Sequence, residues 1–271
     1  HGWIPQLVEA DILEPITNYL NEDDMDQYVQ SALEDTRMNG VNYAVPAWHG
    51  PIALYGNIEL MKKAGVPLRS PEDIHEFKEW IAKIGDLGQT ENGQDIIGFA
   101  LRNAKTANSA FWFVPWIWSW GGELVDDNGN PSLDTEEFVD ALDFYHRLTN
   151  NGYSPKGADH AATRIAFAQE RAGFVFDGPW LKGMLRTMTD NENIDDTHMV
   201  LVVPKGLESG EPWSIANPTS FVVFNGSEHK EEAFEFVKFF TQNQEVQGIV
   251  YNDMGLLPAN LEFLENDPSM Q

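Results

Sequence analysis

The chain has 271 residues, of which 42% are hydrophobic, and it carries a formal net charge of −26. This length can form one large or two medium domains, and so acidic a chain would be repelled by nucleic acid and by anionic membranes. Cysteine is absent, which excludes disulfides, thiolate metal sites and a cysteine nucleophile. No window approaches the run of about 18 apolar residues that a membrane-spanning helix needs, and the first residues show no signal-peptide pattern.

In the first half of the chain, short apolar runs alternate with helical patterns. Strands are predicted at 43–46, 52–55 and 97–101, because these runs are rich in β-formers and are bounded by Gly, Pro or Asn. Between the second and third strands, a helix is expected to begin at a Ser70 cap and to end at Gly85. The segment 111–120 carries aromatic rings on every face of a helix, so some rings must enter the core and others must face a cleft.

The second half continues the alternation. A capping-box pattern at 134–137 predicts a helix that ends near Gly152. Strands are predicted at 172–176, 199–203 and 220–224. A further helix is expected to begin near Ser227, with an apolar face formed by Ala233, Phe236, Val237 and Phe240. Helices that alternate with strands in this way are typical of an α/β fold.

The sequence contains none of the common catalytic or metal-binding motifs. The His residues form no HExxH pattern, and neither a GxSxG elbow nor a phosphate-binding P-loop is present. We therefore predict no catalytic residue, no metal ligand and no cofactor.

Aromatic residues are the most informative feature, since nine Trp, sixteen Phe and seven Tyr make up 12% of the chain. Several of them flank turns, where side chains project into clefts. A pyranose has a face of C–H groups that stacks on an aromatic ring, and its hydroxyls need polar partners. The aromatic set therefore favours a sugar-binding surface. The candidate residues are Trp3, Trp48, His49, Phe111, Trp112, Asp177, Trp180 and Trp213.

Ordered short motifs along nearly the whole chain resemble the maltose-binding-protein-like family of bacterial sugar-binding proteins, also called extracellular solute-binding family 1. Each motif is weak alone, but the ordered set is specific. The matching segments are GWI at 2–4, YAVP at 43–46, ALYGN at 53–57, MKKAGVP at 61–67, GGELV at 121–125, FAQERAGF at 167–174, DGPW at 177–180, AFEFVKFF at 233–240 and LLPA at 256–259.

The resemblance implies a type II periplasmic-binding-protein fold with two lobes, each a mixed sheet flanked by helices. We expect residues 1–52 in the N-terminal lobe and residues 53–216 in the C-terminal lobe. Residues 217–258 would return to the N-terminal lobe, and residues 259–271 would begin a last segment of the C-terminal lobe. We also expect the natural chain to continue beyond both ends of this sequence.

The resemblance also suggests roles for particular residues. Trp180, in the DGPW motif, would stack on the sugar, and Phe111 and Trp112 would supply further aromatic contacts. Trp48 and His49 would line the cleft near a hinge. The chain departs from the family at Trp120, where a polar residue is common, and it shows no clear match to the acidic contacts that some members have near Gly50. These departures leave the particular sugar open.

Together these features predict the non-enzymatic receptor of an ABC importer, which captures a sugar or oligosaccharide between two lobes by hinge closure. Its expected partners are the sugar and the permease subunits, and it would act as a monomer outside the cytoplasm. It could lie free in a periplasm or be a lipoprotein on the cell surface. Two alternatives stay open: the same fold with a non-sugar ligand such as a polyamine, ferric ion or phosphate, and a secreted glycoside hydrolase with two carboxylates.

Overall fold

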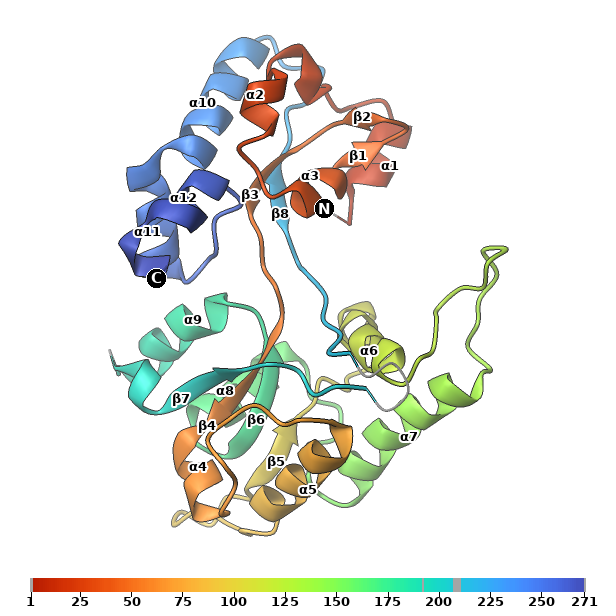
Figure 1. Cartoon of the computed structure of the whole chain (residues 1–271), viewed down its shortest axis with the longest axis vertical. Helices are drawn as coiled ribbons and strands as arrows, with labels where there is room; N and C mark the ends of the chain where they lie inside the picture. The colour runs from red at the N-terminus through yellow and green to blue at the C-terminus, as the bar shows by residue number, and fades with distance from the viewer. Residues whose placement is uncertain (1, 192, 207–210, 271) are drawn as a thin grey trace. The chain divides into compact units, whose positions relative to one another are not determined.

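The computed structural model describes residues 2–191, 193–206 and 211–270, and it divides the chain into two compact units (Figure 1). Unit 1 comprises residues 1–51 and 216–271, and unit 2 comprises residues 52–215. These boundaries lie one residue from the two crossings expected at 52/53 and 216/217.

The structure corrects the expected place of residues 259–271, which belong to unit 1 and not to the other lobe. Phe263 is fully buried there and packs its ring against Tyr251 with centroids 6.1 Å apart. The backbone N–H of Leu261 donates to the carbonyl of Gln27 at 2.8 Å. Burial of an apolar ring and pairing of the backbone therefore hold this segment in unit 1.

Unit 1 is built around one antiparallel strand pair, β3 (Val45–Trp48) and β8 (Thr219–Phe221), in which Val45 lies opposite Phe221. Its core includes Phe234, which stacks on Tyr19 with ring centroids 4.2 Å apart. Its other elements are α1 (Ile4–Glu9), α2 (Glu22–Met25), α3 (Gln30–Glu34), β1 (Arg37–Met38), β2 (Val41–Asn42), α10 (Lys230–Gln242), α11 (Gln244–Met254), α12 (Leu261–Asn266) and 3-10 turns at Ile16–Asn18 and Pro268–Met270.

Unit 2 contains a mixed sheet in the order β5-β6-β4-β7, in which β5 and β6 are parallel and β4 is antiparallel to both β6 and β7. The strands are β4 (Ala53–Asn57), β5 (Ile97–Ala100), β6 (Ala172–Asp177) and β7 (His198–Leu201). The other elements are α4 (Ile58–Lys63), α5 (Ile74–Gly85), α6 (Ala107–Ser119), α7 (Glu136–Asn150), α8 (His160–Ala168), α9 (Trp180–Thr189) and a 3-10 turn at Ile194–Asp196.

Successive strand residues point to opposite faces of this sheet, and each face is covered by helices (Figure 1). On one face, Phe174 and Phe176 join the cluster that includes residues of α5, α6 and α7. On the other face, Val175 packs with Phe167 of α8 and Leu181 of α9.

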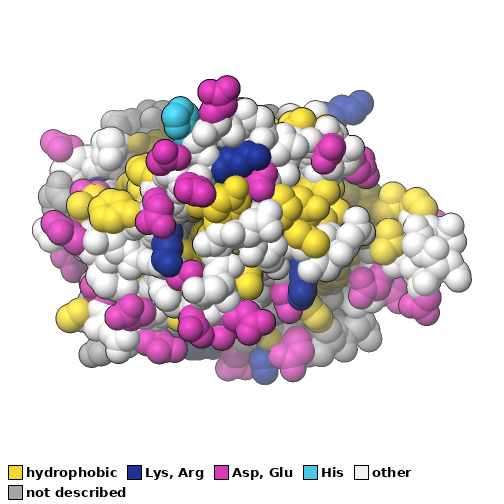
Figure 2. Space-filling view, turned by 90° about the horizontal axis from the view of Figure 1, so that it is seen from above, with side chains coloured by type: hydrophobic (Ala, Val, Ile, Leu, Met, Phe, Trp, Pro, Cys, Tyr) yellow, Lys and Arg dark blue, Asp and Glu magenta, His cyan; other side chains and the backbone are white. Residues whose placement is uncertain are grey.

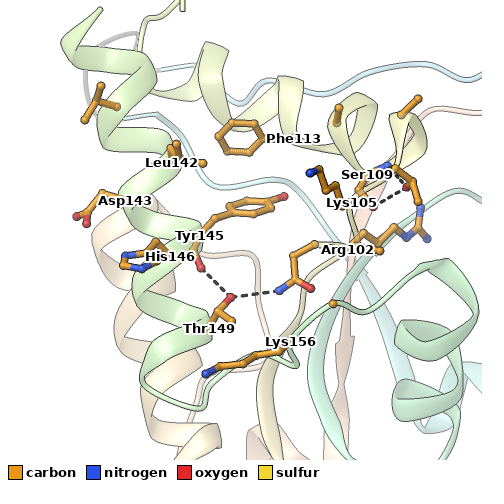
Figure 3. Close-up of a pocket in the computed structure, with 17 residues that line it drawn as sticks. Arg102, Lys105, Ser109, Phe113, Leu142, Asp143, Tyr145, His146, Thr149 and Lys156 are labelled. Atoms are coloured by element: carbon orange, nitrogen blue, oxygen red, sulfur yellow. Dashed lines mark hydrogen bonds between the residues drawn. The ribbon is translucent and has the colours of Figure 1, made fainter. Parts of the chain in front are cut away.

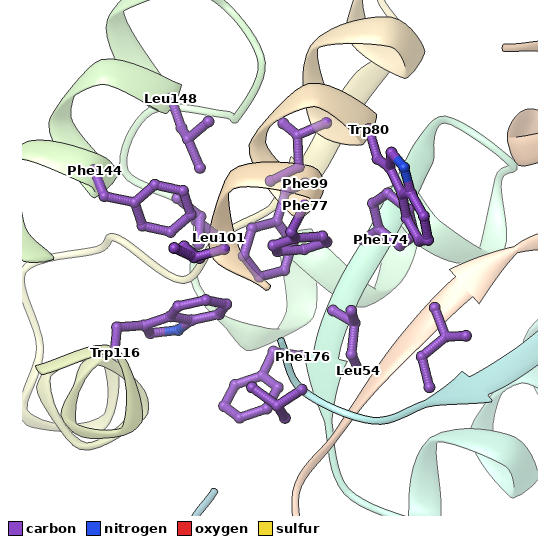
Figure 4. Packing of buried hydrophobic residues seen from close by; sticks show 14 of the residues in the cluster. Leu54, Phe77, Trp80, Phe99, Leu101, Trp116, Phe144, Leu148, Phe174 and Phe176 are labelled. Atoms are coloured by element: carbon purple, nitrogen blue, oxygen red, sulfur yellow. The ribbon is translucent and has the colours of Figure 1, made fainter. Parts of the chain in front are cut away.

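The centre of the larger cluster is an aromatic group around Phe77 (Figure 4). The Phe77 ring lies 5.3 Å from Phe99, 5.1 Å from Phe174 and 6.1 Å from Trp116. Glycine allows the close contact between α5 and the sheet, since a Cβ added at Gly98 would lie 2.1 Å from the carbonyl oxygen of Ile81. Much of the aromatic surplus in the sequence therefore serves packing.

All six predicted strands are present within three residues of their expected bounds, whereas the very short β1 and β2 were not predicted. The helix expected from Ser70 begins at Ile74, because the Asp73 carboxylate, and not Ser70, accepts from the Glu76 N–H. The Ser70 hydroxyl instead accepts from the backbone N–H of Val202.

The apolar face predicted for α10 is partly wrong. The helix begins at Lys230 and directs Phe234 and Val237 into the core, while Phe236 is exposed. Phe234 is buried because its ring stacks on the Tyr19 ring, a partner that Phe236 does not have.

Acidic side chains are scattered over the face of the molecule seen in Figure 2, with few Lys or Arg side chains between them. This distribution agrees with 43 acidic against 17 basic residues in the sequence. Among the helices that the structure describes, none is long and apolar enough to cross a membrane.

Candidate sugar-binding site

A buried carboxylate at the end of β6 organises the most prominent of the candidate residues. Asp177 ends a strand whose six residues are all buried, and its side chain has no exposed surface. Its Oδ2 accepts from Arg102 Nη2 at 2.5 Å and from Arg164 Nε at 2.7 Å. Its Oδ1 accepts from Arg164 Nη2 at 2.9 Å and from the Gly178 N–H and Trp180 Nε1, each at 2.8 Å.

The two arginines balance the charge that is buried at this point. The Arg102 side chain is 3% exposed, and its guanidinium lies 3.7 Å from the centroid of the Trp112 ring. Burial lowers the pKa of Arg102, and the opposing charge of Asp177 favours its protonated form. An arginine remains protonated in proteins, so the carboxylate of Asp177 is paired with two buried or partly buried cations.

This network fixes the Trp180 ring. Trp180 is the first residue of α9 and follows the turn Gly178-Pro179. A Cβ added at Gly178 would lie 2.3 Å from the Trp180 ring, so the indole closely covers that glycine. With its Nε1 bound to Asp177, the half-buried ring can offer an exposed face but not its N–H to a ligand.

The sequence suggested Asp177 as a ligand contact, and in the structure its oxygens are engaged by protein donors. A carboxylate has about four lone-pair sites, and Asp177 already accepts five hydrogen bonds while completely buried. It positions Trp180 and leaves no acceptor for a sugar hydroxyl.

The α6 residues Phe111 and Trp112 have different environments. Trp112 is buried between the Arg102 guanidinium and the edge of Phe176, whose ring centroid is 5.9 Å away. Phe111 is half-buried and meets Trp112 edge-on at 6.2 Å. Phe111 can therefore contact a ligand, while Trp112 supports the ring behind it.

Trp213 lies in the segment that leads to the end of unit 2, and its ring centroid is 5.9 Å from that of Trp118 at the C-terminal end of α6. It is 42% exposed. Within unit 2, the structure thus brings Trp180, Asp177, Trp112 and Phe111 together and pairs Trp213 with Trp118.

Trp3, Trp48 and His49 belong to unit 1. Trp48 is half-buried and packs edge-on against Phe221 at 6.4 Å. His49 donates its backbone N–H to the carbonyl of Leu257 at 2.8 Å, and desolvation lowers the pKa of its half-buried ring. Trp3 is 81% exposed and precedes α1. Trp48 ends β3 and is followed directly by His49, whereas Trp3 caps a different element.

A pocket of about 970 Å³ lies between α6, α7 and the segment that follows β5 (Figure 3). Phe113, Leu142 and Tyr145 contribute to its walls, and the Asn103 amide donates to Thr149 Oγ1 at 3.2 Å across it. None of the eight candidate residues lines this pocket.

The sequence interpretation missed Arg102 and Arg164. Arg102 directly follows the apolar strand β5, and a charged residue at the end of a buried strand is a usable signal because it needs a partner. Arg164 lies on α8, and nothing in its local pattern distinguishes it from a surface residue. In the part of the chain that the structure describes, no three His, Cys, Asp or Glu side chains are placed to hold a metal ion.

Comparison with known proteins agrees with this architecture. A binding protein of Brucella abortus is 25% identical over 268 residues, which cover 98% of this chain and 62% of that protein. The maltotriose-binding protein of Pyrococcus abyssi is 26% identical over all of this chain and 55% of its own length. The chain thus spans less than two thirds of these relatives.

Among solved structures, maltose-bound MalE3 of T. maritima superposes with a TM-score of 0.85 at 22% identity, over 99% of this chain and 66% of that one. This likeness establishes the two-lobed α/β fold. The family model described as bacterial extracellular solute-binding protein matches residues 1–271. The chain therefore belongs to the bacterial extracellular solute-binding protein family.

Proposed function

We propose that the protein is the sugar-binding receptor of an ABC importer and acts by binding without catalysis. The observation that carries this proposal is the half-buried Trp180 ring, which is fixed by a hydrogen bond to the buried Asp177 and lies in the same cluster as Phe111. An aromatic face that is oriented in advance suits the C–H face of a pyranose, and it loses little freedom on binding.

The relatives support the same ligand class. The protein of Pyrococcus abyssi is named for binding maltotriose, and the relative in Halalkalibacterium halodurans, 22% identical over 97% of this chain, is named for arabinooligosaccharides. Permease subunits would be the protein partners. Hinge rotation about the crossings at 51/52 and 215/216 would couple binding to transport.

Hydrolysis of a glycoside is disfavoured by the state of Asp177, the acid next to the Trp180 ring. A catalytic carboxyl group must reach the glycosidic bond, and this carboxylate is completely buried and accepts from two arginines. Outside the cytoplasm, either a lipid anchor or free diffusion in a periplasm would suit a receptor.

Isothermal titration of the full-length protein against monosaccharides and oligosaccharides, with spermidine as the competing ligand class, tests the proposal. We expect saturable binding of one sugar class, unchanged sugar after prolonged incubation, and loss of binding in Trp180→Ala. Binding of spermidine alone would assign a polyamine ligand, and cleavage of the sugar would overturn the non-enzymatic role.

A further inference from the structure

The helix α6 carries a half-buried stripe that extends away from the Trp180 group. Phe111, Val114 and Trp118 are half-buried at positions i, i+3 and i+7, whereas Trp112 and Trp116 on the other side are buried. Residues seven apart return to the same face of a helix, and they are separated by about 10 Å along its axis. Phe111 and Trp118 are therefore two aromatic positions on one face.

Trp213 enlarges the far end of this stripe. Its ring lies against that of Trp118 at 5.9 Å and 54°, and 42% of Trp213 stays exposed. Two hydrogen bonds hold this part of the chain against Ile52, the residue before β4. The Ser214 hydroxyl donates to the carbonyl of Ile52 at 2.5 Å, and the Ile52 N–H donates to the carbonyl of Ile215 at 2.9 Å.

Exposed surface distinguishes this pair from the core tryptophans Trp80, Trp112, Trp116 and Trp120, all of which are buried. Within the described residues, neither Trp118 nor Trp213 donates its ring N–H to a protein acceptor. Two indoles with exposed surface and free donors match the chemistry of a sugar, which offers a C–H face and hydroxyl acceptors.

We propose that Trp118 and Trp213 form a second stacking site, so that the ligand is an oligosaccharide whose outer ring binds there. This inference rests on the proposed sugar-binding function and names its ligand class. One sugar ring cannot reach from Phe111 to the Trp118–Trp213 pair about 10 Å further along α6, whereas a chain of linked rings can.

The test measures affinity against ligand length. Titration calorimetry on the full-length protein uses glucan, arabinan and xylan oligosaccharides of one to four rings. The variants are then measured with the series that the wild-type protein binds. Trp213→Leu keeps an apolar side chain but removes the flat ring. We expect this variant to bind the longest ligands with about tenfold lower affinity. Affinity for the shortest bound ligand should change less than about twofold, and Trp213→Phe should retain most of the affinity.

Two further variants separate the possible causes. Phe236→Leu replaces another exposed ring that has an aromatic neighbour, Phe240 at 6.2 Å, but lies in unit 1. It should leave every affinity unchanged. Trp118→Leu should reproduce the length-dependent loss, and unfolding midpoints establish that each variant is folded.

The outcomes are distinct. If Trp213→Leu binds all lengths like the wild type, or loses affinity equally at all lengths, the second stacking site is refuted while the proposed receptor function stands. If the wild-type protein binds no sugar of any series, both the receptor function for sugars and the second stacking site are refuted.

Discussion

The indole nitrogen of Trp180 donates to Oδ1 of Asp177 at 2.8 Å, and that carboxylate is completely buried. The same Asp177 side chain pairs with Arg102 and Arg164. The orientation of a ring with exposed surface is thus set by a charge network inside unit 2. Substitutions in the network should therefore change binding and stability together.

Replacing Asp177 with alanine should strongly destabilise the protein. Removal of the carboxylate leaves the buried Arg102 without its counter-charge, which typically costs about 3–5 kcal/mol. Urea unfolding measures the change in free energy. Asp195→Ala is the matched control, because Asp195 pairs with Lys182 at the exposed surface and should cost less than about 1 kcal/mol. Equal effects of the two substitutions would contradict a structural role for the buried pair.

Adding one methyl group at Gly178 should weaken sugar binding. A Cβ there would lie 2.3 Å from the Trp180 ring, so Gly178→Ala must displace the ring from its bond with Asp177. We expect at least about a tenfold loss of affinity, equivalent to about 1.4 kcal/mol. Gly226→Ala is the control, since a Cβ at that position meets no atom within 4 Å. Unchanged affinity in Gly178→Ala would show that the ring position does not matter for binding.

The aromatic group around Phe77 should dominate the stability of unit 2. Phe77→Ala leaves a cavity among Phe99, Phe174 and Trp116, and core Phe→Ala substitutions cost about 3–5 kcal/mol. Calorimetric unfolding should show a lowered transition for unit 2. Phe224→Ala removes an exposed ring and should have an effect within about 0.5 kcal/mol.

The buried His198 should make the folded protein less stable at mildly acidic pH than at neutral pH. Desolvation lowers the pKa of its ring, whose Nδ1 lies 2.8 Å from Thr197 Oγ1 and whose Nε2 is buried without a partner in the described structure. The folded state therefore binds fewer protons than the unfolded state, so stability increases with pH. The stability that neutral His198 contributes is fully present above the unfolded-state pKa of about 6.5. It is lost as the pH falls through the lower pKa of His198 in the folded state.

Unfolding by urea at a series of pH values between neutral and mildly acidic checks this dependence. His198→Gln should reduce the loss of stability on acidification, and His75→Gln on the exposed face of α5 should not. Because burial also lowers the pKa of His49, a smaller part of the acid dependence should remain in His198→Gln. An acid dependence that is the same in both variants would rule out His198 as its source.

Local patterns in the sequence were sufficient for the six longer strands and for the family. The alternation of apolar runs with helical segments predicted all six principal strands, because a buried strand needs apolar residues bounded by residues that break it. The motifs that resemble sugar-binding proteins, including DGPW at 177–180, placed Trp180 after a strand, where β6 does end at Asp177.

Only the tertiary structure decided which polar and aromatic side chains meet. Arg102 lies 75 positions before Asp177, and Arg164 lies 13 positions before it. No local sequence pattern predicts that these side chains meet. The same holds for Trp118 and Trp213, and for Phe234, which is buried in place of Phe236 because Tyr19 lies opposite it. A sequence specifies local preference through spacing and residue type, whereas burial and partnership depend on which distant elements pack together.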